Sequence, residues 1–202
     1  MPDVDITPQQ WRGDVTFAAG LLADRRVAIT GGGAVRDTRA RLLALGALVD
    51  ELSGDALVDE GVAAGWARAR APLHALVFDA GAGFGAGGAE ALRGTMEHAW
   101  RAVRAVATGA LIDAPDPGRL LLIAPRPDAG PHASAARAAL ENLARTLSVE
   151  WARYAITAIA LWPGQDTTDA ELAELACFLI SPAGGYFTGC RFELGSVPIA
   201  AR

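Results

Sequence analysis

The sequence predicts an α/β protein: a three-layer, doubly wound, mostly parallel sheet of about six strands, which is a shortened Rossmann-like fold. From residue 26 onward, short apolar runs alternate with longer segments of helical spacing. The runs at 119–124 and 156–162 are almost continuously apolar, as is typical of strands buried on both faces. Parallel strands need a crossover connection, and helices of the predicted length supply one.

The first predicted strand and helix are separated by glycines. An apolar run at 27–30 stops at Gly31, and a helical segment at 35–45 ends at Gly46. The later elements, in order, are a strand at 47–52, a helix at 55–70, a strand at 74–79, a helix at 89–112, a strand at 119–124, a helix at 133–151, a strand at 156–162, a helix at 169–180 and a strand at 191–194. Residues 1–25 are polar and mixed and predict a loose arm, so 26–202 is expected to be one domain.

Composition excludes several classes of function. The chain has 202 residues, a formal net charge of -5, and no lysine, so Schiff-base and P-loop lysine chemistry are absent. The charge pattern gives no footprint for nucleic acid or an anionic membrane. Cys177 and Cys190 show no metal or disulfide spacing, and no apolar run is long enough to span a membrane. We therefore expect a cytoplasmic protein without a metal site.

The glycine turn after the first strand is a candidate phosphate site. Gly31 and Gly33 would let the backbone approach a phosphate at the following helix, and Asp50 or Glu51 lies where a ribose-binding acid is expected. The same turn is also compatible with adenosylmethionine binding, or with an ordinary strand-to-helix connection that binds nothing. We keep these readings open.

The chain resembles the short-chain dehydrogenase/reductase family from Leu22 to Ser196. The resemblance rests on five motifs in the family's order: VAITGGG, LVFDAG, GRLLLIAP, ARAALENLARTLSVEWARYAITAIALWPG and LACFLISPAGGYFTGCRFELG. It implies a Rossmann-like fold, an NAD(H) or NADP(H) cofactor and oxidoreductase chemistry. The chain departs from the family at the catalytic positions.

Family members transfer a proton with a tyrosine four residues before a lysine, helped by a serine on the preceding strand. Aligned on these motifs, Ala133 replaces the tyrosine, Arg137 the lysine and Pro125 the serine. The sequence therefore predicts no catalytic residue of the family's kind. His132, beside Arg137, and His98, near the family's asparagine position, are the remaining candidates for acid/base chemistry.

The resemblance also indicates what has been lost around a cofactor. Asp79 replaces the family's second asparagine and Gly81 follows it, so both are candidate cofactor contacts, although an acid near a pyrophosphate is repulsive. The interval after the second strand leaves no room for another strand-and-helix unit, and few residues follow Pro163 before the last helix. We expect that no cofactor binds, and NAD(H) or NADP(H) if any does.

The last expectation concerns assembly through the two long predicted helices. In the family they pair across a two-fold axis, and here they keep apolar residues at helical spacing: Trp100, Val103, Leu140, Leu143, Leu147 and Trp151. The function we expect is a non-catalytic subunit that assembles with an active family member, or with itself, through these helices. Two alternatives stay open, an NAD(P)-dependent oxidoreductase with an atypical active site and a sensor of small molecules or nucleotides.

Overall fold

Six strands form one sheet in which every neighbouring pair is parallel. The computed structural model describes residues 17–31, 35–84 and 88–195. The strand order is β2-β1-β3-β4-β5-β6. The strands are β1 (Arg26–Thr30), β2 (Leu48–Leu52), β3 (Ala75–Asp79), β4 (Arg119–Ile123), β5 (Thr157–Trp162) and β6 (Cys190–Glu193). The predicted fold class is confirmed.

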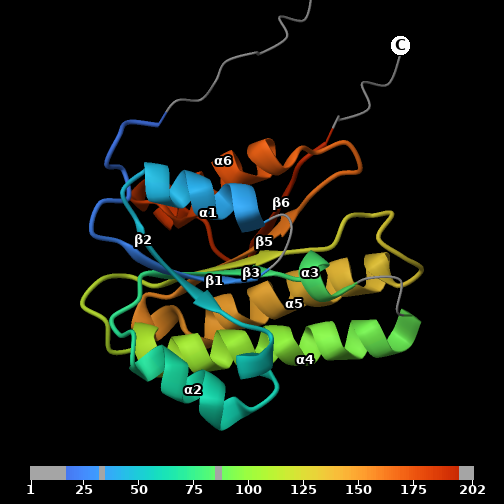
Figure 1. Ribbon diagram of the computed structural model, residues 1–202, viewed down its shortest axis with the longest axis horizontal. Helices are drawn as coiled ribbons and strands as arrows, with labels where there is room; N and C mark the ends of the chain where they lie inside the picture. The colour runs from blue at the N-terminus through green and yellow to red at the C-terminus, as the bar shows by residue number, and fades with distance from the viewer. Residues whose placement is uncertain (1–16, 32–34, 85–87, 196–202) are drawn as a thin grey trace, which may run out of the picture.

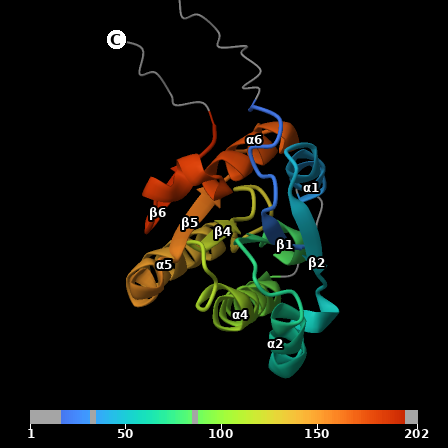
Figure 2. The ribbon, with the colours of Figure 1, turned by 90° about the vertical axis from the view of Figure 1, so that its left-hand side faces the viewer.

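Helices cover both faces of the sheet (Figures 1 and 2). One face carries α1 (Val35–Ala44) and α6 (Asp169–Ile180), which pack against each other. The opposite face carries α2 (Glu60–Arg68), α4 (Gly88–Val106) and α5 (Ala133–Glu150). Short helical segments complete the described chain: η1 (Asp55–Leu57), α3 (Gly81–Phe84), η2 (Ala107–Leu111), η3 (Ala152–Tyr154) and η4 (Pro182–Tyr186).

The apolar strands divide their side chains between two cores. In β4, Leu120 and Leu122 belong to the core beneath α2, α4 and α5, whereas Leu121 and Ile123 belong to the core beneath α1 and α6. This division follows from the two-residue period of a strand. Strands of this kind need apolar residues at every position, which is why β4 shows no polar alternation.

Most predicted limits agree with the structure to within one residue at one end, and three elements differ more. The helix predicted at 55–70 is split into η1 and α2, because the Asp59 side chain caps a new helix by accepting the Val62 N–H at 2.9 Å. The helix predicted at 89–112 ends as an α-helix at Val106 and continues as one wider turn, η2. The last strand is Cys190–Glu193, one residue earlier than predicted.

The expected loss of a strand-and-helix unit is visible in the topology. Within the described residues, β2 pairs only with β1, and the chain then passes through η1 and α2 to β3 on the other side of β1. The strand order therefore reverses between β1 and β3. In open α/β sheets, ligands bind at the carboxyl ends of the strands beside such a reversal.

Part of the N-terminal arm is docked. Leu22 is 1% exposed and its N–H donates to the Leu45 carbonyl at 3.0 Å, while Phe17 stacks on Phe178 of α6. Residues 1–16, including Trp11, lie outside the described residues. Among the helices that are described, none has the length and apolar character needed to cross a bilayer.

Candidate functional site

Two cavities lie at the carboxyl ends of the central strands. The first cavity, about 210 Å³, opens between the ends of β1 and β3. The second cavity, about 440 Å³, opens beyond β3 and β4 and is bounded by the start of α6. Asp79, the last residue of β3, lines both. We call the two together the crevice.

Asp79 is the central charged group of the crevice. Its side chain is 4% exposed, and Oδ1 accepts the Gly81 N–H at 2.8 Å. Its own N–H donates to Thr30 Oγ1 at 2.8 Å, which ties the ends of β3 and β1 together. Oδ2 is buried and has no hydrogen-bond partner among the described residues. Burial raises the pKa of Asp79 to about 6, against the opposing effect of the Gly81 and Ala82 N–H groups.

The first cavity holds two further polar side chains, both from α4. Thr95 is 5% exposed, and its hydroxyl lacks a hydrogen-bond partner within the described part of the chain. His98, one turn later, lines the same cavity as Asp79. His98, a candidate for acid/base chemistry in the sequence, therefore belongs to the crevice. No group of three or more potential metal ligands was found among the described residues.

The two acids of β2, Asp50 and Glu51, occupy different places. Asp50 forms ion pairs with Arg26 and Arg70, at 3.4 and 3.1 Å, and does not line the crevice. Glu51 instead lies against the glycine turn, since a Cβ added to Gly31 would come within 2.8 Å of its Oε1. Gly33, the other predicted phosphate contact, falls outside the described residues. The predicted cofactor role of Asp50 is therefore not supported by its position.

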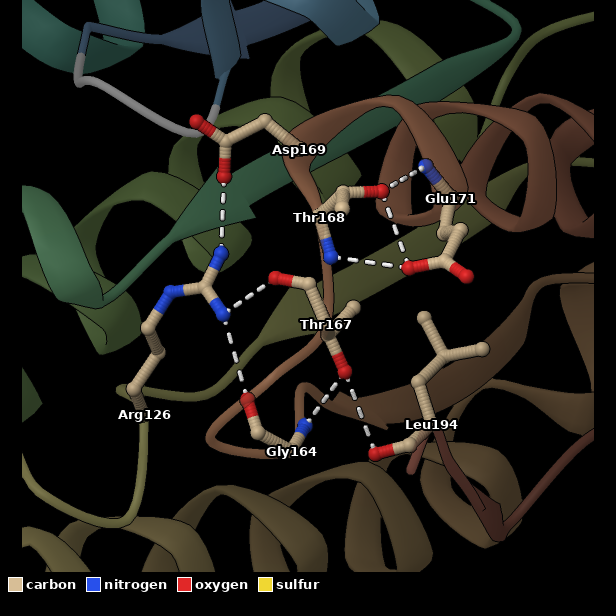
Figure 3. A network of polar contacts seen from close by, with 7 residues as sticks. All are labelled: Arg126, Gly164, Thr167, Thr168, Asp169, Glu171 and Leu194. Carbon is tan, nitrogen blue, oxygen red and sulfur yellow. Dashed lines mark hydrogen bonds and ion pairs between the residues drawn. The ribbon is translucent and has the colours of Figure 1, made fainter. Parts of the chain in front are cut away.

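Arg126 lines the second cavity. Figure 3 shows its polar contacts. Arg126 follows β4 and reaches the connection between β5 and α6, where it donates to the carbonyls of Gly164 and Thr167 and to Asp169 Oδ1 at 2.8 Å. Thr168 then caps α6 through a reciprocal pair of hydrogen bonds with Glu171. The connection between β5 and α6 is short, and Gly164, Thr167 and Thr168 each form hydrogen bonds within it.

Arg137 ties the ends of two strands together. Its guanidinium is buried, donates to the carbonyls of Pro125 and Pro163, both at 2.8 Å, and stacks on Trp162. Arginine stays protonated and two carbonyls engage its Nη1, so this group orients backbone and does not exchange a proton. Ala133, aligned with the tyrosine position, is 1% exposed and packs on Phe84.

His132 precedes α5 and makes no side-chain capping bond. It does not line either cavity of the crevice. Among the described residues around the second cavity, the ionisable ones are Asp79, Arg126, Asp128 and Asp169. A tyrosine, lysine or histidine able to act as a family-like proton donor is missing from that set.

The predicted interface residues separate into three groups by exposure. Val103, Leu140 and Leu147 are no more than 2% exposed and belong to the chain's own core, so they are not available to a partner and that part of the prediction is wrong. Leu143 and Trp151 are partly buried against the same core. Trp100 is 45% exposed on α4. The apolar spacing of these helices reflects internal packing more than an interface.

The described residues of the crevice offer a phosphate little positive charge. No arginine is among the described residues that line the first cavity, and an ionised Asp79 would repel a phosphate. Arg126, in the second cavity, is already engaged by three acceptors. The first cavity also falls below the roughly 300 Å³ at which ligand pockets usually begin.

Several residues of the crevice were not found from the sequence. The hydrogen-bond partner of Thr30 is 49 residues away in the sequence, and the partners of Arg126 are 38 to 43 residues away. Thr95 belongs to the crevice only because it lines the first cavity. One signal existed: Arg126 stands directly after the apolar run 119–124 and Pro125. A charged residue at the carboxyl end of a buried strand is placed at the crevice by the topology alone.

Comparison with solved structures identifies the fold. The chain is similar to the citronellol catabolism dehydrogenase AtuB of Pseudomonas aeruginosa PAO1, with a TM-score of 0.73 and 20% identity over 88% of this chain and 96% of that one. A short-chain dehydrogenase from Mycobacterium smegmatis gives 0.72 and 20%, over 88% and 94%. A 3-ketoacyl-(acyl-carrier-protein) reductase from Brucella melitensis, complexed with NADH, gives 0.72 and 19%, over 86% and 97%.

No protein-family model and no curated protein matches the sequence. The solved structures share about one residue in five with this chain, so the likeness establishes the short-chain dehydrogenase/reductase fold and not an activity.

Proposed function

We propose that this protein is a non-catalytic chain with the short-chain dehydrogenase/reductase fold, which acts by assembling with a complete, active member of that family. The observation that carries the proposal is the hydrogen bonding of Arg137. Arg137 stands at the lysine position, where its guanidinium is held by the carbonyls of Pro125 and Pro163. A group fixed in this way holds strand ends together and cannot relay a proton.

The partner surface in this proposal is the outer face of α4 and α5. These helices pack against each other, and each leaves a large apolar side chain in solvent: Trp100 is 45% exposed on α4 and Val149 is 75% exposed on α5. Exposed tryptophan is a frequent anchor of protein interfaces. The active partner would supply the tyrosine and lysine that this chain lacks, and this chain would stabilise it by mass action.

Native mass spectrometry of a tagged chain purified gently from its own cells tests the assembly. We expect a stoichiometric complex with a complete family member and its loss in Trp100→Ser. Arg93→Ser is the matched control, since Arg93 is exposed on the same helix. A homo-oligomer without such a partner contradicts the proposal. So does a chain that alone reduces carbonyls with NADH or NADPH at a rate that His98→Ala abolishes.

A second candidate is an oxidoreductase with an atypical active site. Asp79, whose pKa burial raises to about 6, and His98 line one cavity, so the crevice holds a carboxyl group and an imidazole, two side chains used in acid/base catalysis. One solved structure of the same fold was complexed with NADH. This candidate requires tight binding of NADH or NADPH, and calorimetry that detects no heat with either cofactor rules it out.

A further inference from the structure

We propose that Arg119 is the centre of an oxyanion-binding site at the amino end of the sheet, which accepts a carboxylate or phosphate group of a small molecule. Arg119 is the first residue of β4. The crevice lies at the carboxyl ends of the same parallel strands, so the two sites are at opposite ends of the sheet. The inference goes beyond the proposed function and does not depend on it.

The first argument is that Arg119 has no acceptor. Its Nη1 is buried without a hydrogen-bond partner, and no ion pair or hydrogen bond to its guanidinium exists among the described residues. Burial and the charge of Arg25 lower the pKa of Arg119. A guanidinium nitrogen removed from water without an acceptor is costly, so the position favours an anion from outside the chain.

The carboxylate that lines a cavity together with Arg119 already has other partners. Asp116 and Arg119 both line a cavity of about 210 Å³. Asp116 Oδ2 lies 2.7 Å from Arg25 Nη1 and 3.4 Å from His74 Nε2. His74 Nδ1 accepts the Arg26 N–H at 3.0 Å, which leaves Nε2 as the nitrogen that donates to Asp116. Arg25 thus neutralises Asp116, and the positive charge of Arg119 is left over.

A second, larger cavity on Arg119 gives space for a ligand. It measures about 470 Å³, and Arg119 is the only charged residue among the described ones that line it. Ile156 and neighbouring alanines form an apolar wall, and Tyr186, 92% exposed, stands at the cavity. A ligand with an anionic head and a small apolar body matches these walls, because the planar fork of a guanidinium binds carboxylate or phosphate with two parallel hydrogen bonds.

Gly185 of η4 sets the position of the guanidinium. A Cβ at this residue would lie 3.0 Å from Arg119 Nη2 and 3.1 Å from Nη1. The absence of a side chain lets the fork rest against the backbone of η4. Gly185→Ala would therefore displace the guanidinium while keeping its charge. This variant tests the effect of the position of Arg119 on binding apart from the effect of its charge.

The test uses benzoate and phenyl phosphate as probes, with benzamide as the neutral analogue, at constant ionic strength. Either anion should shift the NMR signal of the Arg119 Nε–H saturably and raise the thermal unfolding midpoint, by roughly 5 to 10 °C at a hundredfold excess over Kd. The tighter of the two anions identifies the head group. Benzamide should do neither. Absence of a saturable shift with both anions overturns the proposal.

Three variants complete the test. Arg119→Met should weaken binding at least tenfold and Gly185→Ala by a smaller factor. Arg153→Met, which removes an exposed arginine that does not line the cavity, should leave binding unchanged. If Arg119→Met binds as tightly as the unmodified chain, the assignment is wrong. Should that variant fail to fold, Gly185→Ala decides in the same way.

Discussion

The arginines at the two ends of the sheet differ in their hydrogen bonding. At the carboxyl end, Arg137 donates to two strand-end carbonyls and stacks on Trp162. At the amino end, Arg119 is half-buried and has no acceptor among the described residues. The first arrangement completes the fold. The second leaves a bonding requirement open, and such a requirement indicates a ligand more directly than the shape of a cavity does.

The same substitution at both arginines gives the largest expected contrast. Arg137→Met leaves the carbonyls of Pro125 and Pro163 without their donor, and we expect it to lower the free energy of unfolding by about 3 kcal/mol. Arg119→Met removes an unpaired charge and should leave that free energy unchanged or higher. Urea unfolding in chloride buffer free of other anions measures both. Equal losses in the two variants would remove the distinction between the two ends.

Asp79 is expected to give a smaller, pH-dependent effect within the crevice. Since burial raises its pKa from 3.8 to about 6, the native state binds a proton more tightly than the unfolded chain does. The stability that this provides is present below pH 4 and is lost as the pH rises through 6. Asp79→Asn removes the titration, so at pH 7.5 the variant should be more stable than the unmodified chain by about 2 kcal/mol.

Urea unfolding at pH 4 and pH 7.5 checks this expectation, and the advantage of Asp79→Asn should vanish at the lower pH. The charged groups that act on Asp79 are Asp169, which raises its pKa, and Arg126, which lowers it. Asp128→Asn is the matched control, because Asp128 lines the second cavity but is exposed. An advantage that persists at pH 4 would show that Asp79 does not titrate as described.

The smallest expected effect tests the bonded connection between β5 and α6. Thr168→Ala removes the cap of α6 and should lower the free energy of unfolding by about 1 kcal/mol. Thr146→Ala, on the exposed face of α5, is the control, since its hydroxyl only bonds back to the Asn142 carbonyl. Chemical denaturation of both variants provides the measurement, and equal stability would mean that the cap does not fix this connection.

The order and type of the elements could be predicted from the sequence because they depend on local patterns. Gly31 and Gly46 mark the turn before α1 and its end, and the run 119–124 contains β4. The end of α4 could not be predicted, since the apolar spacing continues to residue 112 while the backbone widens into η2 after Val106. Periodicity reports which face is buried and not where the backbone hydrogen-bonding pattern changes.

Part of the site could be predicted from the resemblance. Asp79 was found because it replaces the family's second asparagine in the motif LVFDAG, and the structure places it at the end of β3 beside the reversal of strand order. Arg126 and Arg137 bind carbonyl groups, which every residue possesses, so residue identity carries no signal for their partners. The apolar spacing of α5 was correct, but Leu140 and Leu147 proved to face the chain's own core. A pattern cannot distinguish an internal neighbour from an external one.

The loss of the unit beyond β2 has a consequence for the solubility of the protein. It leaves β2 as an edge strand, and an edge strand can add strands from other molecules and start aggregation. Here β2 is only five residues long, and its third and fourth residues are Asp50 and Glu51. The ion pairs of Asp50 with Arg26 and Arg70 hold charged side chains beside this edge. A short, charged edge of this kind disfavours pairing with strands of other molecules.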